Sequence, residues 1–218
     1  MFSRPDYTPR VHDLLVLKPG RSVEAESTNP EWVRSALIHS RFVVTRREAA
    51  PPGMIAVGVR GPSRDQRWAG FVTNADVQQI IGPGVLRSRN ADIARRSLPS
   101  IEALRYAEER LRPLTLEWGP VGSVGYELAT GLSATRLESD LDLVIYTPHP
   151  VLRDEVRCFW NVLNVAPARI DVRLETPAGG FSLEEYVRDG QDRVLLRMPT
   201  GPILTDDPWR PAERTASA

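Results

Sequence analysis

Asp140 and Asp142 are two aspartates separated by a single residue, a type and spacing suited to binding metal ions. Side chains alternate along a β-strand, so both carboxylates would point to one face while Leu141 and Leu143 point to the other. Their Cα atoms would lie about 6.6 Å apart at the rise of a strand. At that separation two carboxylates can bind the same divalent cations, and a phosphate can fill the remaining coordination positions of the metal. The pair therefore predicts a metal site for phosphoryl transfer.

Two further features complete this arrangement. Gly122 and Ser123 lie at the predicted start of a helix, where close backbone approach, N–H groups and a hydroxyl suit a triphosphate. Asp171 lies in a later apolar strand that would neighbour the strand of Asp140 and Asp142. Three carboxylates on adjacent strands repel one another unless cations neutralise them. We expect these three aspartates to bind two Mg²⁺ ions, with Mn²⁺ as the alternative metal.

The role of Asp171 is open at this point. It would be a third metal ligand, or the base that helps to deprotonate the acceptor. The alternative is a surface carboxylate paired with Arg169 or Arg173, which lie two residues away on either side.

The elements that must position these residues alternate between strand and helix in the second half of the chain. This pattern predicts an α/β fold with a small mixed sheet. A boundary near residue 95 would separate a smaller N-terminal α/β domain, 1–95, from a catalytic domain, 96–218. The predicted catalytic-domain helices are 99–111, 124–130, 151–163 and 183–188, and the strands are 114–118, 141–146, 169–174 and 194–198.

The first half is expected to contain mainly strands. A helix is predicted at 30–39, with Asn29 as its N-cap. The segment 74–98 has no clear assignment, because glycine and proline interrupt it at 82–84. The predicted strands are 12–17, 42–46, 55–60 and 67–72.

Composition narrows the class of protein. The 218 residues allow one large or two small domains, and 41% hydrophobic content suffices for a core. A formal net charge of zero argues against general affinity for nucleic acid or acidic membranes. The chain lacks an apolar run that could span a bilayer and a signal segment, and its single cysteine fits a reducing compartment. We expect a cytoplasmic protein.

Several other side chains are given structural roles. Cys158 is predicted to lie in the core, because it belongs to an apolar helical run. His12, His39 and His149 are scattered without the spacing of metal ligands, so they are also taken as structural.

The chemistry-bearing residues resemble a known pattern. The nucleotidyltransferase superfamily has the order found here, which is Gly122-Ser123, then Asp140-Leu141-Asp142, then Asp171. More narrowly, residues 118–131 and 139–143 resemble the phosphoribosyl-dephospho-CoA transferases of malonate decarboxylase, also called malonate decarboxylase holo-acyl-carrier-protein synthases. The likeness extends to 10–14, 57–61 and 201–204, so it covers most of the chain.

This resemblance implies a specific reaction in a nucleotidyltransferase-like C-terminal domain. The donor would be 2′-(5-triphosphoribosyl)-3′-dephospho-CoA, and the acceptor a serine hydroxyl of the acyl carrier subunit of malonate decarboxylase. Attack at the phosphorus nearest the ribose would release pyrophosphate and leave a phosphodiester-linked group. Asp140 and Asp142 would be metal ligands at the centre of catalysis, and Gly122 and Ser123 would hold the β- and γ-phosphates. Positioning and charge stabilisation would do most of the work, without a protein nucleophile.

The arginines of the first half offer a second binding surface. Arg60, Arg64 and Arg67 lie around the predicted turn between strands 55–60 and 67–72. Arginine is suited to bidentate phosphate recognition, so Arg60 and Arg64 are candidates for binding phosphates of the donor or acidic residues of the carrier subunit. The alternative is a solvated arginine-rich face.

Two other functions stay open. One is an ordinary nucleotidyltransferase that uses ATP, CTP or UTP. Residues 132–138 argue against it, because they add a loop between Ser123 and Asp140 that the superfamily's usual spacing lacks. The other is a catalytically idle module that binds the carrier subunit. The clustered carboxylates argue against it, because they are costly to keep without a metal.

Overall fold

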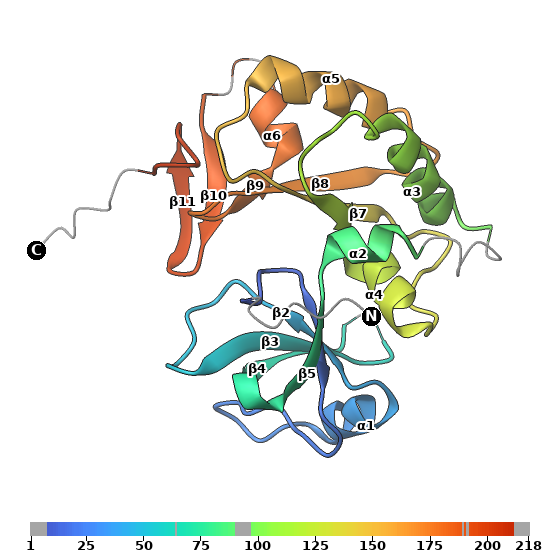
Figure 1. The fold of residues 1–218 in the computed structure, drawn as a ribbon, viewed down its shortest axis with the longest axis vertical. Helices are drawn as coiled ribbons and strands as arrows, with labels where there is room; N and C mark the ends of the chain where they lie inside the picture. Colours follow the sequence, from blue (N-terminus) through green and yellow to red (C-terminus); the bar gives the residue numbers. More distant parts are fainter. Residues whose placement is uncertain (1–7, 64, 90–96, 189, 191, 212–218) are drawn as a thin grey trace, which may run out of the picture.

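The protein folds around two β-sheets, each with its own helices (Figure 1). The structure, a computed structural model, describes residues 8–63, 65–89, 97–188, 190 and 192–211. The predicted mixed α/β class and its two-domain arrangement are confirmed. The boundary expected near residue 95 lies outside the described residues.

The N-terminal sheet is antiparallel and has the strand order β4-β3-β2-β1-β5. Helix α1 (Glu31–His39) packs on it through buried Val33 and Leu37. The N-cap of this helix is Pro30, and not Asn29 as predicted. The side chain of Asn29 instead accepts a hydrogen bond from Trp68 Nε1 at 2.7 Å and donates to the carbonyl of Val23. The strands are β1 (Leu14–Leu17), β2 (Phe42–Thr45), β3 (Met54–Arg60), β4 (Arg67–Thr73) and β5 (Val77–Ile81), and a 3-10 turn, η1 (Asn74–Asp76), precedes β5.

The C-terminal sheet has the order β11-β10-β9-β8-β7-β6, and its β7–β8 pair is parallel. Helices α3 (Pro99–Arg110), α5 (Arg153–Leu163) and α6 (Leu183–Val187) lie on the face away from the N-terminal domain (Figure 1). Helices α2 (Pro83–Arg87) and α4 (Gly122–Thr130) lie nearer that domain. The strands are β6 (Trp118–Pro120), β7 (Leu141–Tyr146), β8 (Ile170–Glu175), β9 (Gly180–Ser182), β10 (Val194–Met198) and β11 (Gly201–Thr205).

Side-chain alternation in β7 and β8 separates the core from the site. Leu141 and Leu143 of β7 and Val172 of β8 are buried in the main hydrophobic cluster. The opposite face carries the polar residues, and the ladder pairs Asp142 with Asp171. The same hydrophobic pattern that buries one face therefore presents both carboxylates on the other.

Several elements differ from the sequence-based expectation. The strand predicted at 114–118 is β6 at Trp118–Pro120, and β5, α2, β9 and β11 were not predicted. The Gly-Pro-Gly stretch at 82–84 does not prevent regular secondary structure, because Pro83 is the first residue of helix α2, a position that proline favours. Within the described part of the chain, no helix is long and apolar enough to cross a membrane.

Cys158 was predicted to be a core residue, and this prediction was wrong. The residue is exposed. The buried side chains of α5 are Val156 and Leu163, which lie two residues before and five after it. A helix turns 100° per residue, so Cys158 is carried away from this buried stripe.

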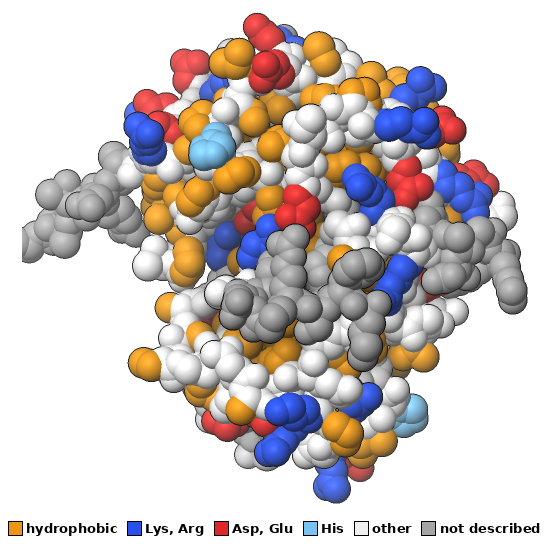
Figure 2. Space-filling view, viewed as in Figure 1, with side chains coloured by type: hydrophobic (Ala, Val, Ile, Leu, Met, Phe, Trp, Pro, Cys, Tyr) orange, Lys and Arg blue, Asp and Glu red, His pale blue; other side chains and the backbone are white. Residues whose placement is uncertain are grey.

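The segment before β1 ties the two domains together. Arg10 donates through both terminal nitrogens to the carboxylate of Glu117, at 3.0 and 2.7 Å. Its guanidinium carbon lies 3.9 Å from the centre of the Tyr146 ring, and the Tyr146 hydroxyl donates to the carbonyl of Val11 at 2.9 Å. Basic and acidic side chains gather in the hollow where the domains meet (Figure 2).

Candidate active site

Three aspartates predicted to act together lie at the start of β7 and β8. Asp140 directly precedes β7 and is exposed, whereas Asp142 is the second residue of the strand and is partly buried. Asp171 pairs with Asp142 across the parallel ladder and lies 3.6 Å from Arg173, measured from Oδ2 to Nη2. The sheet thus brings together the two carboxylate positions that the sequence placed on neighbouring strands.

The environment of Asp142 is unfavourable for a negative charge. Burial raises the pKa of its carboxyl group above the ordinary value, and the charges of Asp171 and Asp140 raise it further. The positive charges of Arg173 and His12 act in the opposite direction without cancelling the effect. Clustered carboxylates with a raised pKa are common at functional sites, where a cation or substrate compensates the repulsion.

Gly122 begins α4 directly against Asp142. Its φ is +60°, and a Cβ atom at this position would lie 2.0 Å from Asp142 Oδ2. The backbone N–H of Val121 also donates to the carbonyl of Asp142 at 2.9 Å. The first N–H groups of a helix have no acceptor within the helix and carry the positive end of its dipole. The backbone N–H groups at Gly122 and Ser123 therefore form a site suited to phosphate beside the carboxylate of Asp142.

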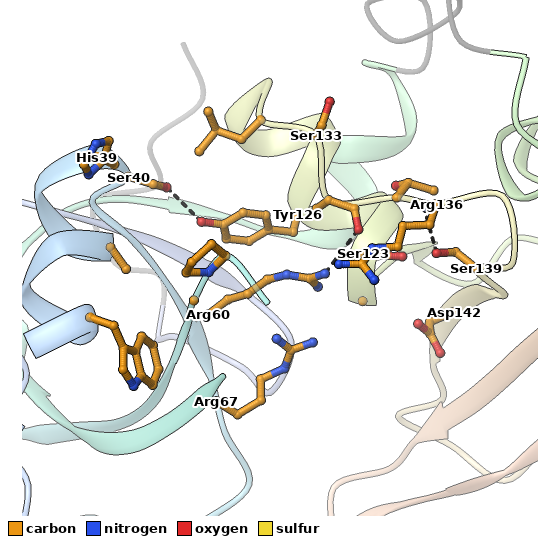
Figure 3. A pocket seen from close by; sticks show the side chains of 18 of the residues that line it. His39, Ser40, Arg60, Arg67, Ser123, Tyr126, Ser133, Arg136, Ser139 and Asp142 are labelled. Carbon is orange, nitrogen blue, oxygen red and sulfur yellow. Dashed lines mark hydrogen bonds between the residues drawn. The ribbon is translucent and has the colours of Figure 1, made fainter. Parts of the chain in front are cut away.

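A cavity of 1040 Å³ lies between the two domains and opens onto this site (Figure 3). Its walls come from α1, from the β3–β4 turn, from the start of α4 and from the loop at 132–139. Asp140, Asp142, Gly122 and Ser123 line it, whereas Asp171 lies outside its lining. The volume is at the upper end of the range for ligand clefts.

Two arginines of the N-terminal domain reach into this cavity. Arg60 and Arg67 are cross-strand partners at the ends of β3 and β4, and their guanidinium groups point toward the side of Ser123 and Asp142 (Figure 3). Arg60 Nη2 donates to the carbonyl of Ala134 at 3.2 Å. Arg64, which was predicted beside Arg60, lies outside the described residues. Arg67 was noted only as a turn residue, because its pairing with Arg60 across the hairpin depends on register.

The loop that interrupts the usual superfamily spacing is a wall of the cavity. Glu127, a buried residue of α4, anchors it by accepting from the backbone N–H groups of Ala134 and Thr135, at 2.9 and 2.8 Å. Because Arg60 bonds to Ala134, the anchored loop also meets the N-terminal domain. Glu127 was not predicted to be functional, since a glutamate inside a helix gives no signal of a loop seven residues away.

A second polar cluster lies at the other end of β8, around Glu175. His12 Nε2 lies 3.0 Å from Oε1 of Glu175, and Arg47 Nη2 donates to both oxygens of the same carboxylate. Glu175 lies on β8 four residues after Asp171, so both side chains share one face. His12, which was predicted to be structural, therefore reaches across the domain boundary.

The residues at this site suit Mg²⁺, although they do not form a closed cage. Among the described residues, no three His, Cys, Asp or Glu side chains converge closely enough to hold a metal alone. Mg²⁺ is commonly held by one or two carboxylates together with substrate phosphates and water. The oxygen ligands of Asp140 and Asp142 beside a phosphate-binding helix end fit that mode.

Sequence comparison decides the family. One family model, described as the phosphoribosyl-dephospho-CoA transferase MdcG N-terminal domain, matches residues 10–83, and the corresponding C-terminal domain matches 86–208. The chain belongs to the phosphoribosyl-dephospho-CoA transferase MdcG family. The resemblance noted in the sequence is thereby confirmed, and the protein is a transferase.

Curated relatives match the MdcG-family chain over almost its full length. The phosphoribosyl-dephospho-CoA transferase of Pseudomonas putida (strain GB-1) is 40% identical over 208 residues, covering 95% of this chain and 98% of that protein. The protein of that name from Pseudomonas aeruginosa is 41% identical, covering 94% and 96%. That from Klebsiella pneumoniae (strain 342) is 36% identical, covering 94% and 98%. No solved structure matches the chain significantly.

Proposed function

We propose that this protein transfers the phosphoribosyl-dephospho-CoA group from 2′-(5-triphosphoribosyl)-3′-dephospho-CoA to a serine of the apo acyl carrier subunit of malonate decarboxylase. Pyrophosphate is the second product. Family membership and the names of the relatives support the transferred group. The observation that carries the proposal is the 1040 Å³ cavity that ends at Asp142 and the start of α4. A cytoplasmic location follows from the proposed donor, a precursor derived from an intracellular coenzyme.

The donor is proposed to bind with its triphosphate at the start of α4. Gly122 and Ser123 offer backbone N–H groups and a hydroxyl to the β- and γ-phosphates. Arg60 and Arg67 point into the same part of the cavity and add positive charge from the N-terminal domain. The dephospho-CoA portion then occupies the remaining length, between α1 and the loop at 132–139.

The three aspartates are proposed to hold two Mg²⁺ ions, or Mn²⁺ in their place, at Asp140, Asp142 and Asp171. When bound, the metal supplies charge neutralisation for the phosphates and assists deprotonation of the acceptor hydroxyl. The chain itself supplies orientation. Val121 ties the end of β6 to β7 by its hydrogen bond to Asp142, which fixes the phosphate-binding turn against the carboxylate.

The loop at 132–139 favours this donor over an ordinary nucleoside triphosphate. It contributes about a third of the residues that line the cavity, and Glu127 holds it in place. A nucleotide that filled only the end near Asp142 would leave this wall without a ligand. We therefore propose that the loop makes room for the larger donor.

Intact mass spectrometry of the apo carrier subunit tests the proposal. The subunit is incubated with the protein, Mg²⁺ and the triphosphoribosyl donor, and with ATP or CTP in parallel reactions. A mass gain equal to phosphoribosyl-dephospho-CoA, absent with Asp142→Asn, is expected. A nucleotide-sized gain with ATP or CTP would retain phosphoryl transfer and overturn the donor. The absence of any gain with a verified carrier would point to the binding-module alternative.

A further inference from the structure

One face of helix α1 lines the cavity, and the proposed phosphate chemistry does not use it. Residues of this face that line the cavity are Trp32, Ser35, Ala36 and His39. Positions separated in this way by three, four and seven residues lie on one side of an α-helix. The buried side chains of α1, Val33 and Leu37, lie about 100° away around the helix axis and pack in the N-terminal domain. The helix therefore turns one face to the core and another to the cavity.

The indole ring of Trp32 is held against the β3–β4 turn. A Cβ atom at Gly61 would lie 2.8 Å from Cε3 of Trp32, so glycine is the residue that leaves room for the ring at this position. The backbone N–H of Gly61 donates to the carbonyl of Gln66 at 3.0 Å, which closes the turn. Trp32 is partly buried and packs against the hydrophobic cluster of the N-terminal domain. The ring is therefore fixed by the turn and the core, and it still lines the cavity.

Small side chains leave the indole ring uncovered on the cavity side. Side chains of a helix lean toward its N-terminus, so the residues three and four positions later are those that can cover Trp32. These residues are Ser35 and Ala36, and both are too small to cover an indole ring. Among the described residues, the indole N–H of Trp32 has no hydrogen-bond partner, whereas that of Trp68 donates to Asn29 at 2.7 Å. Trp32 thus offers aromatic surface to a ligand in the cavity.

This aromatic surface lies on the side of the cavity away from the aspartates. Figure 3 shows His39 and Ser40 on one side of the cavity and Asp142 on the other, with Tyr126 between them. The Tyr126 hydroxyl lies 2.9 Å from Oγ of Ser40, the residue after α1, so the two sides belong to one continuous site. The cavity is therefore charged at the aspartates and has an aromatic wall at Trp32.

The order of groups in the proposed donor matches these two ends. The triphosphate is joined to one ribose, and this ribose is joined to the 2′-oxygen of the adenosine. Two pentoses therefore separate the triphosphate from the adenine, whereas ATP has only one. With the triphosphate at the start of α4, the adenine of the donor lies farther from Asp142 than the adenine of ATP would. Bases stack on tryptophan rings, and this stacking contributes to binding.

We propose that Trp32 stacks on the adenine of the donor, and that the α1 side of the cavity is its purine subsite. This inference rests on the proposed function, because the proposed donor determines where the base lies. Trp32 and Ala36 are then specificity-determining residues. The indole supplies the stacking surface, and the small side chain of Ala36 keeps that surface open.

Two substitutions remove the stacking surface in different ways. Trp32→Leu replaces the ring, whereas Ala36→Leu keeps the ring and places a larger side chain over it. Trp68→Leu is the matched control, because Trp68 is also partly buried and packs against the same hydrophobic cluster but lies outside the cavity lining. Calorimetric titration in the presence of Mg²⁺ measures binding of dephospho-CoA, tripolyphosphate and 4′-phosphopantetheine to each protein. Melting temperatures and transfer to the apo carrier subunit are measured in parallel.

We expect Trp32→Leu and Ala36→Leu to weaken dephospho-CoA binding about 5- to 150-fold, the range for loss of one base–aromatic stack. Binding of tripolyphosphate and of 4′-phosphopantetheine should not change, and Trp68→Leu should bind all three ligands as wild type does. Wild-type affinity for dephospho-CoA in Trp32→Leu, or no dephospho-CoA binding by the wild-type protein, would overturn the inference.

Two other results would also overturn the inference. An equal loss of tripolyphosphate binding in Trp32→Leu would indicate a structural role for the ring. Weaker binding of 4′-phosphopantetheine in Trp32→Leu would assign the α1 side of the cavity to the pantetheine arm. Absence of transfer by a wild-type protein that binds dephospho-CoA through Trp32 would instead refute the proposed function and leave the subsite standing.

Discussion

Replacement of Gly122 by alanine tests the proposed phosphate-binding turn at the start of α4. The φ of +60° would cost the alanine about 1 to 2 kcal/mol of folding free energy. The new Cβ would also lie 2.0 Å from Asp142 Oδ2, a distance at which one of the two groups must move. Relief to ordinary contact requires a displacement of more than 1 Å, and misplacement by about 1 Å costs about 100-fold in rate. That factor equals about 2.7 kcal/mol of transition-state stabilisation.

Gly131→Ala is the matched control for this substitution. Gly131 ends the same helix with a φ of +73°, but nothing lies within 4 Å of its Cβ position. Both variants should lose the stability that the positive φ costs, and Gly122→Ala should lose more because of its contact with Asp142. Only Gly122→Ala should also lose transfer activity, by about 100-fold or more. Gly122→Ala with activity equal to that of Gly131→Ala would refute the assignment of this turn to the reacting phosphates.

Three further predictions concern the carboxylates and the cavity. The raised pKa of Asp142 means that the folded protein loses stability as pH rises through that pKa and the carboxyl group becomes charged. Asp142→Asn should therefore raise the melting temperature of the metal-free protein at neutral pH. The same variant should lose transfer activity and the stabilisation that wild type gains from Mg²⁺ in a thermal-shift titration. Arg67→Ala should raise donor KM several-fold with little change in melting temperature, most clearly at low salt, in initial-rate assays. Glu127→Ala removes the acceptor of two loop N–H groups, so calorimetry should show a loss of about 1 to 3 kcal/mol and kinetics a higher donor KM.

The outcomes that would contradict these predictions are distinct. An Asp142→Asn protein that melts below wild type without metal would show that repulsion among the carboxylates is not the dominant effect. Arg67→Ala with unchanged donor KM would favour the solvated arginine face. Glu127→Gln is the control for Glu127→Ala, because its amide oxygen can still accept from the loop. If Glu127→Gln lost as much donor affinity as Glu127→Ala, anchoring of the loop would not be the cause.

The arrangement of the carboxylates could be predicted from the sequence because it depends on local rules. The two-residue period of β7 places Asp142 on the face opposite the buried leucines, and the same period in β8 places Asp171 on that face too. The helix start at Gly122 also follows from a local glycine signal. These features depend only on residues a few positions apart in the sequence, so they were predicted without knowledge of the packing.

The contributions of the N-terminal domain could not be predicted in the same way. His12 takes its left-handed conformation from contacts with Thr45 and with Glu175, more than thirty and more than one hundred and sixty residues away. Its neighbours in the chain give no turn signal of glycine or asparagine. Arg67 enters the cavity because the β3–β4 register pairs it with Arg60. Long-range contacts and register decide these positions, and a single sequence carries little information on either.

The two domains contribute side chains of opposite charge, and the proposed reaction requires both. The C-terminal domain supplies the carboxylates, and burial together with their mutual repulsion raises the pKa of Asp142. Without cations or arginines, this negative charge would repel a triphosphate. The N-terminal domain supplies Arg60 and Arg67, which line the cavity. The contacts of Arg10 with Glu117 and Tyr146 fix the two sets relative to each other. Because positioning accounts for much of the rate in phosphoryl transfer, this interface is as much a part of the proposed site as the aspartates are.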